Sequence, residues 1–276
     1  MINDSTKSAS AYLLVTHGSR NPHYQIAVEK VAQMVRQQLK LKYVSDGEQK
    51  NGHGSAVAAS KIPRHLVGTS SLELASEPLH KSIEDFAYRA RAIGYQQVII
   101  LPLFLLNGVH VQEDIPTQVK LAKQTLDNSI QLRLLPYLGS HPDLPRVLAQ
   151  KFPSLPSLGK ILLSHGSRLS HANQSMEKLA SKLGAAAAFW ATKPSLDEQV
   201  EFLVATGNQE IVILPFFLFS GGITEAIASQ VQEIQAKFPN QKIILGQSLG
   251  VSEELGAIIA SALMSNSTFV SLDKQK

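Results

Sequence analysis

An internal repeat is the feature of this sequence that most constrains its fold. Residues 17–32 read HGSRNPHYQIAVEKVA and residues 165–180 read HGSRLSHANQSMEKLA, which match at 8 of 16 positions without a gap. Two more pairs follow in the same order: 98–119 is similar to 211–231, and 134–150 is more weakly similar to 244–261. Three ordered matches indicate a duplication, so we expect two versions of one folding unit.

Each copy alternates apolar strands with amphipathic helices. In the first copy, strands are predicted at 12–16, 65–72 and 132–136, and a continuous apolar run covers 98–106. Such runs are typical of parallel strands that are covered on both faces. Between them, apolar residues recur at helical spacing: Val28, Val31, Val35 and Leu39; Ile83, Phe86, Ala90 and Ile93; Ile115, Val119, Ala122 and Leu126. The pattern predicts an α/β fold with a parallel sheet flanked by helices, present twice in pseudo-twofold relation.

The two copies differ in length. From His17 to Pro102 is 85 residues, whereas the matching landmarks in the second copy are 50 residues apart. Most of the excess is assigned to a flexible loop at about 45–62, which is polar and rich in Gly, Ser and Ala. Prolines and a glycine in FPSLPSLG near residue 152 indicate the join. We therefore expect domains at 1–152 and 153–276.

Composition excludes several classes of function. The chain of 276 residues has no cysteine, so disulfides, thiolate metal ligands and cysteine nucleophiles are excluded. It has neither a transmembrane-length apolar run nor an apolar secretory signal at its start. The net charge of +4 comes without any block of Lys or Arg. We expect a cytoplasmic protein that binds neither nucleic acid nor membrane, and whose metal chemistry uses His, Asp or Glu.

Two histidines fall at predicted strand ends. His17 follows the first strand directly, and His110 follows the 98–106 strand and its Asn107–Gly108 turn. In open parallel sheets, ligands bind at the carboxyl ends of the strands. Both imidazoles can therefore reach one crevice, where neutral imidazole binds a divalent metal or accepts a proton.

A carboxylate would complete a site for Fe, Co, Ni or Zn. Glu73 lies where the predicted strand at 65–72 ends, but Glu77 is close enough in sequence to be the alternative. Glu113 and Asp114 follow His110, and they would equally favour the N-terminus of the next helix through its dipole. Arg20 either binds a substrate carboxylate or hydrogen-bonds backbone carbonyls in its own turn.

The second copy keeps only part of this pattern. His165 and Arg168 match His17 and Arg20, but alignment places Ile223 opposite His110 in a segment that is one residue shorter. The same alignment places Trp190 opposite Glu73. We therefore predict one complete site, in the first copy, and one degenerate site in the second.

The ordered motifs resemble a known family. VTHGSR, SLELASEPLHKSI, LPLFLLNGVHVQEDIP, FWATKPSLDEQV and ILPFFLFSGGI together are similar to the sirohydrochlorin chelatases of the CbiX/SirB group, class II chelatases, in their long two-domain form. The resemblance implies two chelatase-like domains and insertion of Fe²⁺ or Co²⁺ into a polycarboxylate tetrapyrrole, sirohydrochlorin, without ATP or an organic cofactor.

The resemblance also assigns roles. It implies that His17 and His110 handle the metal and act catalytically with Glu73. We also expect Ser19, Arg20 and Gly108 to contact the tetrapyrrole. The extra residue between Glu73 and Pro78 departs from the family pattern and leaves Glu77 open as the acid. Iron, giving siroheme, is the expected metal, because the chain has neither a His-rich tail nor cluster-binding cysteines. Cobalt, for cobalamin synthesis, is the alternative, and we expect a monomer.

Two other functions share parts of this pattern. HG after an apolar strand also occurs in histidine phosphatases, but Thr16 stands where their arginine would, so the phosphate clamp is missing. A metallochaperone or tetrapyrrole carrier would use the same two histidines without catalysis. Measuring whether metal insertion exceeds the uncatalysed rate would separate an enzyme from a carrier.

Overall fold

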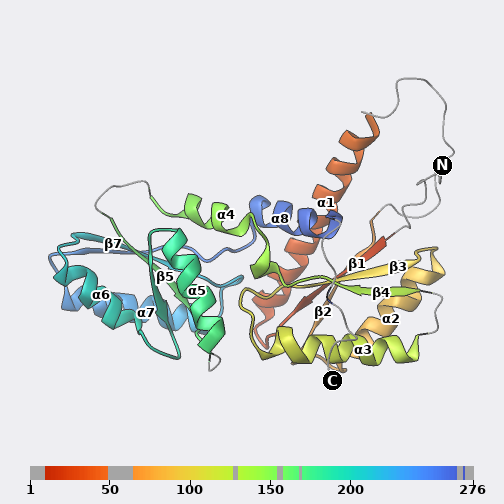
Figure 1. Ribbon diagram of the computed structural model, residues 1–276, viewed down its shortest axis with the longest axis horizontal. Coiled ribbons are helices and arrows are strands. Elements are labelled where there is room, and N and C mark those ends of the chain that lie inside the picture. Colours follow the sequence, from red (N-terminus) through yellow and green to blue (C-terminus); the bar gives the residue numbers. More distant parts are fainter. Residues whose placement is uncertain are drawn as a thin grey trace. The chain divides into compact units, whose positions relative to one another are not determined.

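The computed structural model describes residues 10–48, 65–126, 130–153, 158–167, 170–265 and 270 (Figure 1). Its chain forms two compact units, each with its own four-stranded parallel sheet. The first unit takes the described residues within 1–104, 109–138 and 256–276, and the second takes those within 105–108 and 139–255. Two parallel sheets flanked by helices confirm the α/β fold class that the repeat predicts.

The first sheet has the strand order β2-β1-β3-β4. Its strands are β1 (Ser10–Thr16), β2 (Val67–Ser71), β3 (Gln97–Pro102) and β4 (Gln131–Leu134). The long helix α1 (Pro22–Glu48) lies on one face, and α2 (Leu79–Ala92) and α3 (Ile115–Thr125) lie on the other (Figure 1). Strand β1 is central, and its end pairs with both neighbours, Thr16 with Ser71 and Val15 with Pro102.

The core of this unit is built from the residues that the helical spacing selects. In α1, Val28, Val31, Val35 and Leu39 are all buried. Alternate residues of β1 and β3 pack with the apolar faces of α2 and α3, around Ile83, Phe86, Ile115 and Val119. Gly94, with a φ of 99°, follows the C-cap of α2, because glycine adopts this left-handed conformation without a Cβ clash.

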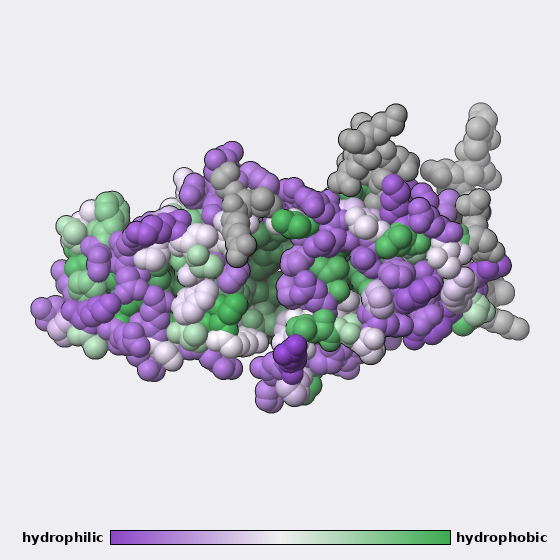
Figure 2. Space-filling model, turned by 90° about the horizontal axis from the view of Figure 1, so that it is seen from below, coloured by the Kyte–Doolittle hydropathy of each residue, from purple (hydrophilic) through white to green (hydrophobic). Residues whose placement is uncertain are grey.

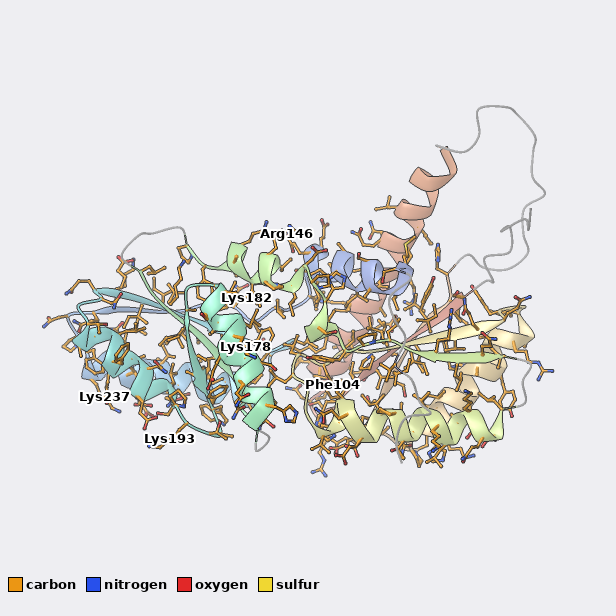
Figure 3. The ribbon with its side chains drawn as sticks, in the orientation of Figure 1. Phe104, Arg146, Lys178, Lys182, Lys193 and Lys237 are labelled. Atoms are coloured by element: carbon orange, nitrogen blue, oxygen red, sulfur yellow. The ribbon has the colours of Figure 1, made fainter. Side chains whose placement is uncertain are left out.

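The second sheet repeats the same topology, with the order β6-β5-β7-β8. Its strands are β5 (Leu158–Ser164), β6 (Ala186–Phe189), β7 (Glu210–Pro215) and β8 (Lys242–Leu245). The helices between them are α5 (Ser170–Lys182), α6 (Leu196–Ala205) and α7 (Gly222–Lys237). Lys237 on α7 pairs with Asp197 on α6 at 2.9 Å, and Lys193 pairs with Glu198 at 2.6 Å (Figure 3).

The last helix of each copy belongs to the opposite unit. Helix α4 (Leu144–Lys151) follows β4 but groups with the second sheet, whereas α8 (Glu253–Met264) groups with the first from Gly256 onward. A Cβ on Gly256 would lie 3.1 Å from that of Met34 on α1, so the two helices approach closely there. The domain boundaries 1–152 and 153–276 describe the duplicated sequence segments, and they stay a prediction.

Two boundaries differ from the sequence prediction. Helix α1 continues to Glu48, so the first residues of the expected loop at 45–62 are helical; residues 49–62, with His53, lie outside the described residues. Strand β3 ends at Pro102, although the apolar run continues to 106. Leu103, the first residue after the strand, is still buried. An apolar run therefore indicates burial, and it does not fix where the extended backbone ends.

The surface in the view of Figure 2 is mostly hydrophilic, with smaller apolar patches among the polar residues. Within the described ranges, no helix combines the length and apolar content needed to span a membrane.

Gly68 gives a test of how tightly α2 packs on β2. A Cβ at this position would lie 2.5 Å from the Phe86 ring, so Gly68→Ala forces the ring or the strand to move. We expect a loss of about 1–3 kcal/mol in the free energy of unfolding, measured by urea denaturation. Gly222→Ala, where an added Cβ meets nothing within 4 Å, is the control and should change it by less than about 0.5 kcal/mol. Equal effects of the two substitutions would contradict this packing.

Candidate metal site

Three loops meet at the carboxyl edge of the first sheet. His17 directly follows β1, Glu73 comes two residues after β2, and His110 begins the turn of helix that leads from β3 into α3. Because β1 lies between β2 and β3, the loops that leave these three strands are neighbours. The strand order therefore brings together side chains that are far apart in the sequence.

The side chains of these residues form a compact cluster. The rings of His17 and His110 are edge to face, with their centroids 5.0 Å apart. His17 Nε2 is 3.9 Å from Glu73 Oε2, and one ligand atom from each of the three residues lies within 4.8 Å of the others. In the part of the chain that the structure describes, this is the one group of three such side chains able to hold a metal ion. About half of the His17 and Glu73 side chains is exposed, so a ligand can reach them.

Backbone hydrogen bonds fix Glu73 beside His17. Leu72 N donates to Thr16 O at 2.8 Å and Glu73 N donates to His17 O at 2.9 Å, which extends the β1–β2 ladder beyond the strands. The next residue, Leu74, has a φ of 57° and is exposed. A leucine in this region is strained, and such strain is often found at functional sites.

His110 is presented by one turn of π-helix, His110–Asp114. Ile115 N donates to His110 O, five residues back, as this wider turn requires. Across the turn, His110 Nδ1 and Asp114 Oδ2 are 2.7 Å apart. One nitrogen of this imidazole is therefore engaged by a carboxylate.

Phe104 lies close to both imidazoles. Its ring centroid is 6.3 Å from that of His17 and 6.1 Å from that of His110, and it packs on the core of the first unit (Figure 3). An apolar support keeps the two rings at the edge of the sheet and lowers the polarity on one side of the cluster. Sequence reasoning missed Phe104, because one aromatic residue in an apolar run carries no signal of its own.

The other candidate residues have mixed positions. Ser19 Oγ accepts a hydrogen bond from Asn21 N at 3.1 Å, so this hydroxyl stabilises its own turn. The side chain of Arg20 is exposed, and Gly108 lies in the turn before His110. Glu77 accepts a hydrogen bond from Ser82 Oγ and is not part of the cluster. Between the two acids, the structure brings Glu73 to the histidines.

The second sheet has apolar residues at the corresponding places. Trp190 N donates to Ser164 O and Ala191 N donates to His165 O, the same bonds that Leu72 and Glu73 make. Ala191 therefore occupies the place of Glu73, and the alignment of Trp190 with Glu73 is wrong by one residue. The loop after a strand carries no periodicity that would fix its register, and the backbone bonds do. Arg168 lies outside the described residues.

Ile223 stands in the place of His110. Leu103 N donates to Val15 O, and in the second copy Phe216 N donates to Leu163 O, so Leu103 and Phe216 correspond. Seven residues further along, without a gap, are His110 and Ile223. Ile223 lies in the ordinary α-helix α7, whereas His110 in the first copy begins the π-turn. The second unit therefore retains His165 but neither of its two partners.

Several solved structures share this fold. SirB from Bacillus subtilis with Fe³⁺ has a TM-score of 0.67 over 92% of this chain and 94% of that one, at 18% identity. The same protein from Bacillus subtilis subspecies spizizenii in complex with cobalt gives 0.62 over 92% and 93%, at 19% identity. At such identities, the likeness shows that the chelatase-like fold is shared.

Curated relatives are also similar in sequence. A sirohydrochlorin cobaltochelatase of Priestia megaterium is 24% identical over 210 residues, which is 70% of this chain and 67% of the relative. A sirohydrochlorin ferrochelatase of the same organism is 23% identical over 203 residues, 68% of this chain and 73% of the relative.

The family comparison covers both copies of the repeat. The family model for CbiX matches residues 11–155 and again residues 159–265, which together include nearly all of both sheets and all of the cluster residues. The chain therefore belongs to the CbiX family, with the family module present twice.

Proposed function

We propose that this protein is a sirohydrochlorin chelatase, which inserts a divalent metal into the tetrapyrrole. The observation that carries the proposal is the cluster of His17, Glu73 and His110 at an exposed sheet edge. Two imidazoles and one carboxylate form a ligand set that suits Fe²⁺ and Co²⁺, and open positions remain for the pyrrole nitrogens. Two curated relatives, named as cobaltochelatase and ferrochelatase, support the same reaction.

The metal is a substrate, so it must be held and then released. His17 and His110 bind the incoming ion through imidazole nitrogens, and Glu73 completes the set with an oxygen and one negative charge. A half-exposed site suits transfer, because each protein ligand can be replaced by a nitrogen of the macrocycle. A closed four-ligand cage would hold the ion in place, as structural metal sites do.

Insertion also requires proton removal. When the macrocycle takes up one divalent ion, it loses the protons of two pyrrole N–H groups, and the net charge is conserved. As each imidazole leaves the metal, its nitrogen becomes free to accept one of these protons. Glu73 relays the protons to water, since its carboxylate is beside His17 and half exposed. The same residues thereby deliver the ion and collect the protons.

The carboxylates of the tetrapyrrole need partners near this edge. We assign Arg20 to this role, because its exposed guanidinium follows His17 by three residues and binds carboxylates in a bidentate geometry. Gly108 leaves room beside His110, since an added Cβ would meet nothing within 4 Å. Ser19 contributes its backbone and the hydroxyl that stabilises the turn.

Iron is the metal that we propose, with siroheme as the product. Cobalt is the second candidate, and the Priestia megaterium cobaltochelatase favours it. No organic cofactor and no ATP take part in this proposal, which places a monomeric enzyme in the cytoplasm. A carrier with the same ligands would bind the substrates without accelerating their reaction.

The first prediction concerns the histidines. His17→Ala and His110→Ala should each lower the rate of metal insertion by about 10²–10⁴-fold, because each removes a metal ligand and a proton acceptor. The rate is followed in the visible spectrum of sirohydrochlorin with Fe²⁺ under anaerobic conditions. His23→Ala is the matched control, since this exposed histidine lies outside the cluster. Wild-type rates in either cluster variant would rule out the two-histidine mechanism.

The second prediction separates the two acids. Glu73→Gln keeps the size of the side chain but removes its charge, so we expect weaker metal binding and slower insertion, by about tenfold or more. Glu77→Gln makes the same chemical change away from the cluster and should leave both quantities near wild type. The reverse result would assign the acidic role to Glu77.

The third prediction tests the backbone that holds Glu73. Gly18 has a φ of 101°, and a Cβ there would lie 2.0 Å from Glu73 O. Gly18→Ala must therefore push the Glu73 loop away from His17, so we expect metal affinity to fall while both side chains remain. Titration with Co²⁺ and the unfolding free energy measure the two effects separately. Unchanged Co²⁺ affinity would show that this close approach does not position the acid.

Competition between the two metals decides the product. Fe²⁺ and Co²⁺ are offered together to the protein and sirohydrochlorin without oxygen, and the ratio of metallated products gives the ratio of kcat/KM. An excess of the iron product supports siroheme synthesis, and an excess of the cobalt product supports the alternative.

A further inference from the structure

Asp114 makes the shortest polar contact to any residue of the cluster. Its Oδ2 lies 2.7 Å from His110 Nδ1, whereas His17 Nδ1, within the described ranges, is paired with Gly18 O at 3.4 Å. The side chains of His110 and Asp114 are 35% and 46% exposed, so the pair lies at the rim and not in the core. A carboxylate held against one nitrogen of a metal-site imidazole restricts what the other nitrogen can do.

This contact spans the π-turn His110–Asp114. In the first copy the segment from residue 98 to Val119 has one residue more than its counterpart, which ends at Val231. The register is ungapped as far as His110 and Ile223, so the additional residue falls within 111–118, and the π-turn His110–Asp114 accommodates it. Side chains four residues apart lie on the same side of a helical turn, and here Asp114 lies beside the ring of His110.

We propose that Asp114 is a positioning residue for the metal-binding imidazole. Its carboxylate accepts the Nδ1–H of neutral His110, so the proton is kept on Nδ1 and the lone pair on Nε2. The same bond fixes the ring against rotation, together with the packing of Phe104. Carboxylates bonded to the outer nitrogen of a metal-ligating histidine orient it and raise its basicity. This inference rests on the proposed function, in which His110 delivers the metal.

Glu113 allows a test of whether Asp114 acts only through the dipole of helix α3. Both acids lie in the first turn before α3, so both would interact favourably with the N-terminus of that helix. Glu113 is exposed and has no ion pair in the described part of the chain, whereas Asp114 contacts His110. Removing either charge changes the dipole interaction similarly, but only the loss of Asp114 frees the imidazole.

The first measurement is Co²⁺ binding by the full-length protein without tetrapyrrole, followed by visible absorption. We expect Asp114→Ala to raise the Kd by about 10–100-fold. Asp114→Asn should fall between this variant and wild type, because its amide oxygen can still accept the Nδ1–H. Glu113→Ala and Glu113→Gln are the matched controls and should bind Co²⁺ with the wild-type Kd. Equal losses in the Glu113 and Asp114 variants would replace the proposal with a purely electrostatic effect.

The second measurement reads the tautomer directly. In protein labelled with ¹⁵N-histidine, long-range proton–nitrogen spectra distinguish a protonated Nδ1 from a protonated Nε2, and the His110→Gln variant assigns the signal. We expect a single Nδ1–H tautomer in metal-free wild-type protein and a mixture in Asp114→Ala. An unchanged tautomer in Asp114→Ala, with an unchanged Kd for Co²⁺, would overturn the proposal even if that variant folds less stably.

These measurements use neither sirohydrochlorin nor turnover, so they are separate from the test of the proposed function. If metal insertion fails but Asp114→Ala alters the tautomer and the Co²⁺ affinity, the positioning role stands in a metal-binding protein. If insertion proceeds and Asp114→Ala changes nothing, the proposed function stands and the positioning role is wrong.

Discussion

The site depends on one constraint, the placement of β1 between two parallel neighbours. Parallel strands end at the same edge of a sheet, so the order β2-β1-β3 makes the loops after these strands neighbours. His17, Glu73 and His110 are separated by 56 and 37 residues in sequence, yet their ligand atoms lie within 4.8 Å. None of the three loops could assemble this cluster alone, and a change in strand order would separate it.

The sequence predicts what periodicity and strand ends determine. The buried faces of α1, α2 and α3 follow from apolar spacing, and the meeting of His17 with His110 follows from their places after parallel strands. The choice between Glu73 and Glu77 does not follow, because it depends on the bond from Glu73 N to His17 O and on a close approach to Gly18. A loop of irregular backbone has no pattern from which such a contact could be read.

Contacts between elements distant in sequence limit prediction in the same way. Alignment alone placed Trp190 opposite Glu73, and only the bonds to the end of β5 show that Ala191 is the counterpart. Helices α4 and α8 each group with the sheet of the other copy, which a linear division of the repeat cannot express. In both cases local propensity is satisfied by either arrangement, and packing selects one.

The duplication turns the second unit into an internal control for the first. Both units have the same strand order and the same bonds from the loop after the second strand, and both keep a histidine after the first strand. They differ at Glu73 against Ala191 and His110 against Ile223, and in the one residue that makes the π-turn. Because the sheet edge itself is common to both, it does not by itself bring together three side chains that could hold a metal ion. The scaffold shared by both copies thus brings the loops together, and the local differences account for the proposed metal ligands in the first unit and for the proposed orientation of His110.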